Sequence, residues 1–185
     1  MHLRPRIPAL ILAAIGIISL FVPLVRAEGK VEPVGTYTSM RYTEEHAYGY
    51  SVEIWREGDK LFGFLIASSG LAGDSPTGLL EDVEYNAQTQ ELLFGARLTK
   101  GLFSDREHRN VPSRDVVRFK GHMRSERIMG IIISTNELTP KAAPIYEKVA
   151  LRRSEEESAS MTRPGSYLEW RREADKVLKR LGPQW

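Results

Sequence analysis

Hydrophobic and polar residues alternate along most of the chain from Gly35 to Arg152. In the segment 48–54, large hydrophobic residues occupy every second position, with small or charged residues between them. This period of two is typical of a strand that buries one face. No helical period separates these segments, which argues against a parallel βαβ fold. The predicted strands are Gly35–Tyr42, Tyr48–Glu57, Leu61–Ala67, Thr77–Tyr85, Glu91–Thr99, Asp115–Met123, Arg127–Ser134 and Ile145–Arg152.

The connections between these predicted strands alternate between short and long. Hairpin-length links in sequence order favour an all-β fold, an eight-stranded antiparallel up-and-down barrel, because two-sheet sandwiches usually need Greek-key crossings. Glycines inside five of the strands supply the bends that a small barrel requires. The sandwich remains the alternative. The short links are 58–60, 86–90 and 124–126, and the long ones are 68–76, 100–114 and 135–144, which an up-and-down barrel places at one rim.

The C-terminal segment changes from strand to helix patterning. Residues 154–165 are rich in Ser and acidic side chains and are predicted to be a linker. A helix is then predicted within residues 166–185, because Ser166 and Glu169 form a capping box and Gly182 with Pro183 provides a stop. Its apolar residues fall on one face, which we expect to pack on the barrel wall. That face carries Tyr167, Trp170, Ala174, Val177, Leu178 and Leu181.

The N-terminus has the layout of a secretory signal peptide. Arg4 and Arg6 precede residues 7–25, which carry no charge, and Ala27 ends the segment. A basic start, an apolar run and a small residue at the exit are the three parts of a signal peptide. We therefore expect residues 1–27 to be removed and residues 28–153 to form an exported barrel, periplasmic or extracellular. The alternative is an uncleaved anchor through residues 7–25, which is long enough to span a bilayer.

Composition narrows the possible partners. Beyond residue 27 the chain has 23 Lys and Arg against 24 Asp and Glu, so it lacks the excess of positive charge that phosphate backbones attract. We therefore expect no nucleic acid as partner, and a membrane contact only if the N-terminal segment is uncleaved. The chain contains no Cys, which excludes disulfides and thiolate metal sites.

The arrangement resembles a lipocalin-type barrel of the calycin group. The family begins its first strand with Gly-x-Trp and places an Arg near the end of its last strand, packed over that Trp. Here Gly35-Thr36-Tyr37 and Leu151-Arg152 occupy the corresponding places, with Tyr37 in place of the Trp. The resemblance spans about Gly35 to Leu181 at the level of architecture. It implies a cavity that holds a ligand.

Candidate binding residues lie mainly in the predicted long connections. Arg106, His108 and Arg109 share one such loop and His46 lies in the first, so the barrel topology brings all four to the long-loop rim. Arg recognises carboxylate and phosphate groups through two parallel hydrogen bonds. Phe94 and Phe119 are predicted to face the interior and to line its cavity. A small amphipathic or anionic ligand would fit this combination of residues.

Evidence for catalysis is weak in this sequence. Gly73-Asp74-Ser75 resembles the nucleophile block of a lipase and esterase family, yet no His follows His122 to serve as its base. His46 and His108 have no ligand partner at a metal-binding spacing. We therefore expect no catalytic residues, metal or cofactor. The predicted function is an exported barrel that binds a small or lipid-like ligand at its long-loop rim, and the alternative is a filled barrel that serves as a protein-interaction module of the cell envelope.

Overall fold

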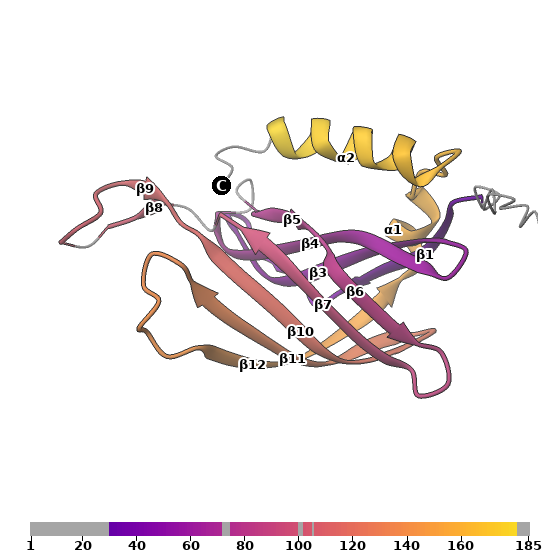
Figure 1. Ribbon diagram of the computed structural model, residues 1–185, viewed down its shortest axis with the longest axis horizontal. Helices are drawn as coiled ribbons and strands as arrows, with labels where there is room; N and C mark the ends of the chain where they lie inside the picture. Colours follow the sequence, from indigo (N-terminus) through magenta and orange to yellow (C-terminus); the bar gives the residue numbers. More distant parts are fainter. Residues whose placement is uncertain (1–29, 72–74, 100–101, 105, 181–185) are drawn as a thin grey trace, which may run out of the picture.

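A computed structural model describes residues 30–71, 75–99, 102–104 and 106–180. These residues form a nearly closed antiparallel β-barrel with a C-terminal helix (Figure 1). The predicted signal peptide, Gly73-Asp74 and the predicted helix stop lie outside the described residues. The strands are β1 (Glu32–Thr38), β2 (Arg41–Tyr42), β3 (His46–Glu57), β4 (Lys60–Leu71), β5 (Thr77–Leu79), β6 (Glu81–Asn86), β7 (Glu91–Leu98), β8 (Leu102–Phe103), β9 (Val111–Pro112), β10 (Asp115–Arg124), β11 (Arg127–Asn136) and β12 (Ile145–Ser154), and the helices are α1 (Glu155–Ser160) and α2 (Tyr167–Arg180).

The strand order confirms the predicted all-β class and up-and-down topology. Neighbours around the sheet run β5-β4-β3-β1-β12-β11-β10-β7-β6, so nine strands follow the barrel path where eight are predicted. The difference arises at Leu80, which divides the predicted strand Thr77–Tyr85 into β5 and β6. β5 pairs with β4 and β6 pairs with β7, so this segment changes partner and brings the two ends of the sheet together. The backbone N–H of Leu80 donates to the carbonyl of Gly63 on β4 at 2.9 Å, which helps to close the barrel.

The barrel interior is filled at its centre by inward-facing hydrophobic side chains. Phe94 on β7 and Phe119 on β10 are paired across the sheet, and their rings stack with centroids 4.9 Å apart. Gly121 and Gly130 oppose each other on β10 and β11, and the Phe119 ring occupies the space above them. Both phenylalanines are almost fully buried in the main core cluster. They therefore contribute packing at the centre of the barrel.

Gly63 on β4 lies directly against the backbone of β3. A methyl group at this position would overlap the carbonyl oxygen of Glu53 on β3. Glycine at such a position allows the sheet to coil tightly. We therefore expect Gly63→Ala to lower the free energy of unfolding by roughly 1–3 kcal/mol, the usual range for overpacking, as measured by urea denaturation. Gly70→Ala on the same strand is the matched control, because among the described residues its added methyl would meet no atom within 4 Å. An equal loss in both variants would contradict this explanation.

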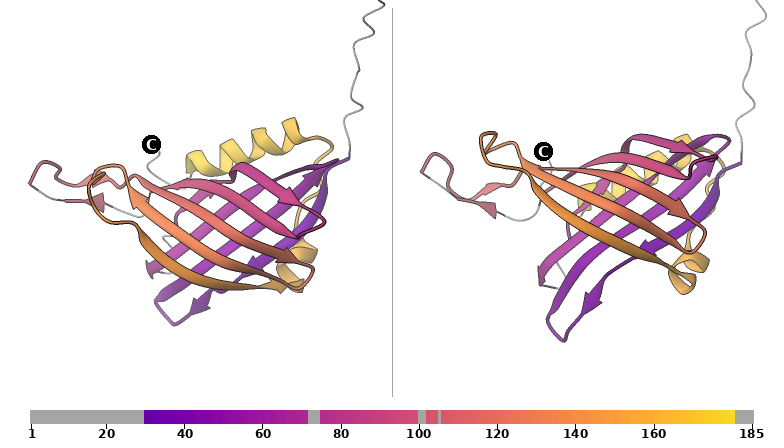
Figure 2. Two further views of the ribbon diagram at one scale, coloured as in Figure 1. Left: turned by 60° about the horizontal axis from the view of Figure 1, so that its bottom comes forward. Right: turned by 90° about the horizontal axis from the view of Figure 1, so that it is seen from below.

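The two rims of the barrel differ as the connection lengths predict. Links 58–59, 87–90 and 125–126 lie at one rim, called here the short-link rim. The strand ends that are joined by the long connections 72–76, 99–114 and 137–144 lie at the opposite, long-loop rim. Within the connection 99–114, β8 and β9 pair as a hairpin that extends away from the barrel (Figures 1 and 2).

The segment that follows β12 is more ordered than the predicted linker. Residues 155–160 form helix α1, because the Ser154 side chain accepts a hydrogen bond from the backbone N–H of Glu157 and three acidic residues occupy the first turn. Ser158 is buried and its hydroxyl accepts a hydrogen bond from the backbone N–H of Thr36 on β1 at 3.0 Å. The predicted linker is thus attached to the barrel wall.

Helix α2 packs on the outside of the barrel, as its apolar face predicts. The side chain of Ser166 accepts a hydrogen bond from the N–H of Glu169, which confirms half of the predicted capping box. The Glu169 carboxylate accepts instead from the N–H of Gly165, at 2.7 Å. Trp170 is only 5% exposed and contacts the aromatic side chains Trp55 on β3 and Phe62 on β4. The C-terminal segment therefore adds a second hydrophobic cluster to that of the barrel interior.

Candidate functional site

A groove lies between helix α2 and the outer wall of the barrel. It has a volume of about 660 Å³ and is bounded by β1, β3, β4 and β5 on one side and by α1, α2 and the segment between them on the other. Figure 1 shows α2 running along the face that these strands form. Its lining is mainly apolar, and consists of Thr36, Glu53, Trp55, Phe64, Ile66, Thr77, Glu157, Ser160, Met161, Thr162, Trp170, Glu173, Ala174 and Val177. We refer to it as the helix–barrel groove.

The alternation along β3 places both an acid and a tryptophan on this outer wall. Val52 and Ile54 point into the barrel core. Glu53 lies between them and Trp55 follows Ile54, so both of these side chains point outward. The Trp55 indole N–H donates to the carbonyl of Thr162 at 3.0 Å. This bond fixes the segment between α1 and α2 over the groove.

Glu53 is the most unusual polar residue of the groove. Burial raises the pKa of its carboxyl, and the nearby negative charge of Glu157 raises that pKa further. Among the described residues, no group donates a hydrogen bond to the Glu53 carboxyl and no cation pairs with it. A half-buried carboxylate without a compensating donor is unfavourable. The Glu53 carboxyl is therefore an acceptor of the groove with which no described group pairs.

Aromatic rings and acids together determine what the groove can bind. Phe64 and Trp170 lie with ring centroids 5.3 Å apart, and Trp55 and Phe64 meet edge to face at 6.0 Å. Besides Glu53, the groove is lined by the acids Glu157 and Glu173, and none of its lining residues is Lys or Arg. Tryptophan faces attract cations, and carboxylates pair with them. The arrangement suits a molecule that combines an apolar body with a positively charged group.

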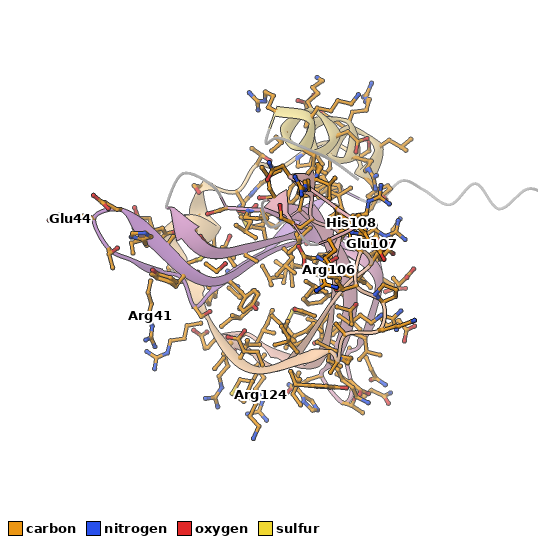
Figure 3. All side chains as sticks on the ribbon, turned by 90° about the vertical axis from the view of Figure 1, so that its left-hand side faces the viewer. Arg41, Glu44, Arg106, Glu107, His108 and Arg124 are labelled. Carbon is orange, nitrogen blue, oxygen red and sulfur yellow. The ribbon has the colours of Figure 1, made fainter. Side chains whose placement is uncertain are left out.

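The residues predicted to bind a ligand lie elsewhere. Arg106, His108 and Arg109 belong to the segment between β8 and β9, and His46 begins β3 with its ring stacked against Tyr48. Figure 3 places Arg106 and His108 on one side of the barrel mouth, and Glu44 of the turn before His46 on the other. The topology thus brings all four to the long-loop rim, but they do not line the helix–barrel groove. A role for them in binding stays a prediction.

A small hollow opens between β3, β4 and β12 near the long-loop rim. It measures about 210 Å³, and its lining includes Tyr48, Tyr50, Ser68 and Glu147. The Tyr50 hydroxyl donates to the Glu147 carboxylate at 2.8 Å, and burial together with this acid raises the pKa of Tyr50. The Ser68 hydroxyl, also in the lining, is buried and makes no hydrogen bond to any of the described residues. The hollow is smaller than the range typical of ligand pockets, roughly 300–1,000 Å³.

A third hollow, of about 480 Å³, lies at the short-link rim. Its inner side includes Tyr37, whose pKa is raised by burial and partly lowered again by Arg153. Arg153 donates to the carbonyl of Val34 at 2.7 Å and pairs with Glu155 at 3.1 Å. Arg153, not Arg152, therefore lies beside Tyr37, because Arg153 pairs with Tyr37 across the sheet while Arg152 points outward. Because Arg153 already makes these contacts, its guanidinium is less available to a ligand than the Glu53 carboxyl of the groove is.

The helix–barrel groove is not among the predicted binding sites, although the sequence contains signals for it. Trp55, Phe62 and Phe64 are large apolar residues at outward positions of predicted strands, so they required a cover. The apolar face of α2 required a partner in turn. Each of these two apolar surfaces needed a partner, and the structure shows that they cover one another on the wall that carries Glu53.

Comparisons with protein-family models, with curated proteins and with solved structures found no match to this chain. Within the described residues, no group of three or more His, Asp or Glu side chains is arranged to hold a metal ion. None of the described helices combines the length and hydrophobicity needed to cross a bilayer. The assignment of function therefore depends on the geometry of the hollows themselves.

Proposed function

We propose that this protein is a small-molecule-binding β-barrel of lipocalin-like architecture whose ligand is an amphipathic cation held in the helix–barrel groove. The observation that carries the proposal is the unsatisfied Glu53 carboxyl inside an aromatic groove. A carboxyl whose pKa is raised by burial in a mostly apolar cleft is a typical mark of a binding site. The nearly closed barrel and the aromatic–arginine contact of Tyr37 with Arg153 support the lipocalin-like comparison.

The expected binding mode follows from the lining of the groove. An alkylammonium head would donate hydrogen bonds to the Glu53 carboxylate, which satisfies the acceptor and supplies the missing positive charge. Its alkyl chain would lie against Trp55, Phe64 and Trp170. A hydrogen bond that involves a charged group contributes about 1.5–3 kcal/mol, which corresponds to roughly a ten- to hundredfold gain in affinity.

The proposal is tested with three probes that share one alkyl chain, namely octylamine, octanol and octanoate. We expect isothermal titration calorimetry at neutral pH to rank their affinities in that order, because only the amine brings a positive charge to Glu53. Glu53→Gln keeps the size of the side chain but removes its charge. This variant should lower the affinity for octylamine by about tenfold or more and leave octanol nearly unchanged.

Two control variants make this test specific. Glu147→Gln removes a carboxylate at the long-loop rim and should leave octylamine binding unchanged. Arg106→Ala combined with Arg109→Ala tests the binding end predicted from sequence. If octanoate binds best and this double variant abolishes its binding while Glu53→Gln does not, the long-loop rim is the binding end and the groove assignment is wrong. Equal octylamine affinity in Glu53→Gln and the unmodified protein would also refute the groove.

We also propose that the barrel functions outside the cytoplasm, as the N-terminal signal-peptide pattern indicates. The proposal predicts that the mature chain begins at Glu28 after cleavage behind Ala27. N-terminal sequencing of the protein isolated from the cell envelope measures this directly. A chain that retains Met1 in the membrane fraction would instead support the anchor through residues 7–25.

A further inference from the structure

The outer wall formed by β10, β11 and β12 faces away from helix α2. Figure 2 shows these three strands in front, with α2 on the other side of the barrel and no helix across them. Each strand pairs with its neighbour in unbroken antiparallel register over at least eight residues. The wall is therefore a continuous stretch of sheet whose outer face no described helix covers.

The register places one kind of charge on this face. Residues that pair with buried core positions point into the barrel, and the residues between them point outward. Asp115 and Glu147 belong to the inward set. All residues of the three strands are described, and their outward positions contain no Asp or Glu. Those positions contain six cations, Arg118, Lys120 and Arg124 on β10, Arg127 on β11, and Lys148 and Arg152 on β12, all of them exposed.

Apolar side chains occupy the middle of the same face. Met129 and Ile131, on the central strand β11, are 37% and 39% exposed, and Tyr146 on β12 is 67% exposed. Lys120 and Lys148 lie directly beside Ile131, one on each neighbouring strand. Two acids border the face: Glu91 on β7 pairs with Lys120 at 4.0 Å, and Glu126 lies in the turn between β10 and β11. We call this surface the basic face.

We propose that the basic face docks the protein on an anionic lipid bilayer. Charge complementarity selects a negatively charged partner, because six cations gather here although the chain beyond residue 27 is nearly neutral. The central apolar side chains select a partner with an apolar interior over a nucleic acid, and tyrosine suits the boundary between headgroups and acyl chains. Each Lys or Arg held near an anionic surface raises affinity roughly fivefold. This contact does not depend on whether the N-terminal segment is cleaved, and it is independent of the groove.

The test measures binding to vesicles by flotation at low ionic strength. Vesicles of phosphatidylglycerol and phosphatidylcholine in equal parts are compared with vesicles of phosphatidylcholine alone. The face variant replaces Arg118, Lys120 and Lys148 by Gln. The matched control replaces the exposed cations Arg163, Arg172 and Lys179 by Gln, so both variants lose three charges. All three proteins keep the same N-terminal segment, so any contribution from that segment cancels in the comparison.

We expect the unmodified protein and the control to float with the anionic vesicles only, and the face variant to bind at least tenfold more weakly. Binding should weaken as salt is added, because salt screens exposed charges. Equal losses in the two variants would show that total charge, not this face, controls binding, and would overturn the proposal. Failure of the unmodified protein to float would overturn it as well and would point to an acidic protein surface. Unchanged melting temperatures exclude misfolding as the cause.

Discussion

Replacing Trp170 by Ala is expected to lower the free energy of unfolding by about 3–5 kcal/mol, the usual cost of truncating a large buried aromatic residue. Trp170 contacts Phe62, Trp55 and Phe64 at ring-centroid distances of 4.6, 5.6 and 5.3 Å, so its loss leaves a cavity between helix and barrel. For a domain of this size the melting temperature should fall by roughly 10 °C, as measured by circular dichroism.

The matched control for this prediction is Leu168→Ala on the same helix. Leu168 is 62% exposed, so its truncation removes few contacts and should change the melting temperature by only about 1–2 °C. In both variants the barrel should keep its β-type circular dichroism, because its own core is separate from the helix cluster. An unchanged melting temperature in Trp170→Ala would mean that α2 does not hold its docked position in solution. The helix–barrel groove would then lose one of its walls.

Octylamine binding is expected to strengthen as the pH rises through the titration of Glu53. Burial and Glu157 raise the pKa of this carboxyl, so the folded protein retains the proton to a higher pH than the unfolded chain does. The cationic amine binds the carboxylate form, so deprotonation of Glu53 should increase its affinity by about tenfold. Affinity should then remain constant until the amine loses its own proton near pH 10. Calorimetric titrations across this pH range, with octanol as the uncharged probe, measure the effect.

The same pKa shift has a consequence for stability without ligand. Because the unfolded chain releases the proton first, the Glu53 contribution to the free energy of unfolding falls as the pH rises from the unfolded pKa to the higher folded pKa. Below that interval the Glu53 carboxyl is protonated in both the folded and the unfolded state, so its full contribution to the free energy of unfolding is present. Urea denaturation should therefore show a decline over this interval that is absent in Glu53→Gln. If the variant declines to the same extent, Glu53 is not the responsible group and the pH dependence of amine binding needs another explanation.

The fold could be predicted from local patterns to a large extent. Alternation along the strands determines which side chains face inward, and the lengths of the connections determine which loops share a rim. These two features define an up-and-down barrel. The all-β class, the strand positions and the docking of the C-terminal helix are confirmed in this way. The division at Leu80 was missed because a change of strand partner leaves the alternation almost intact.

Two errors in the C-terminal part of the barrel have local causes. Helix α1 lies in a segment whose polar composition resembles that of a flexible linker, and its order depends on the buried hydrogen bond from the Thr36 N–H to Ser158. A sequence pattern does not reveal such a contact across more than a hundred residues. Arg152 and Arg153 are adjacent, and only the register between β12 and β1 decides which of them lies beside Tyr37.

The sequence by itself determined the faces of the individual strands and of α2, because the side-chain periods of strand and helix are fixed by backbone geometry. The alternation of residues 48–54 thereby sets Glu53 on the strand face opposite to Val52 and Ile54. Only the tertiary structure decided which wall α2 covers, and hence that Glu53 lies in a groove while the cations of β10 to β12 stay exposed. The reason is physical: burial and charge at these positions depend on contacts between segments distant in the chain, whose relative placement is settled by packing of the whole molecule.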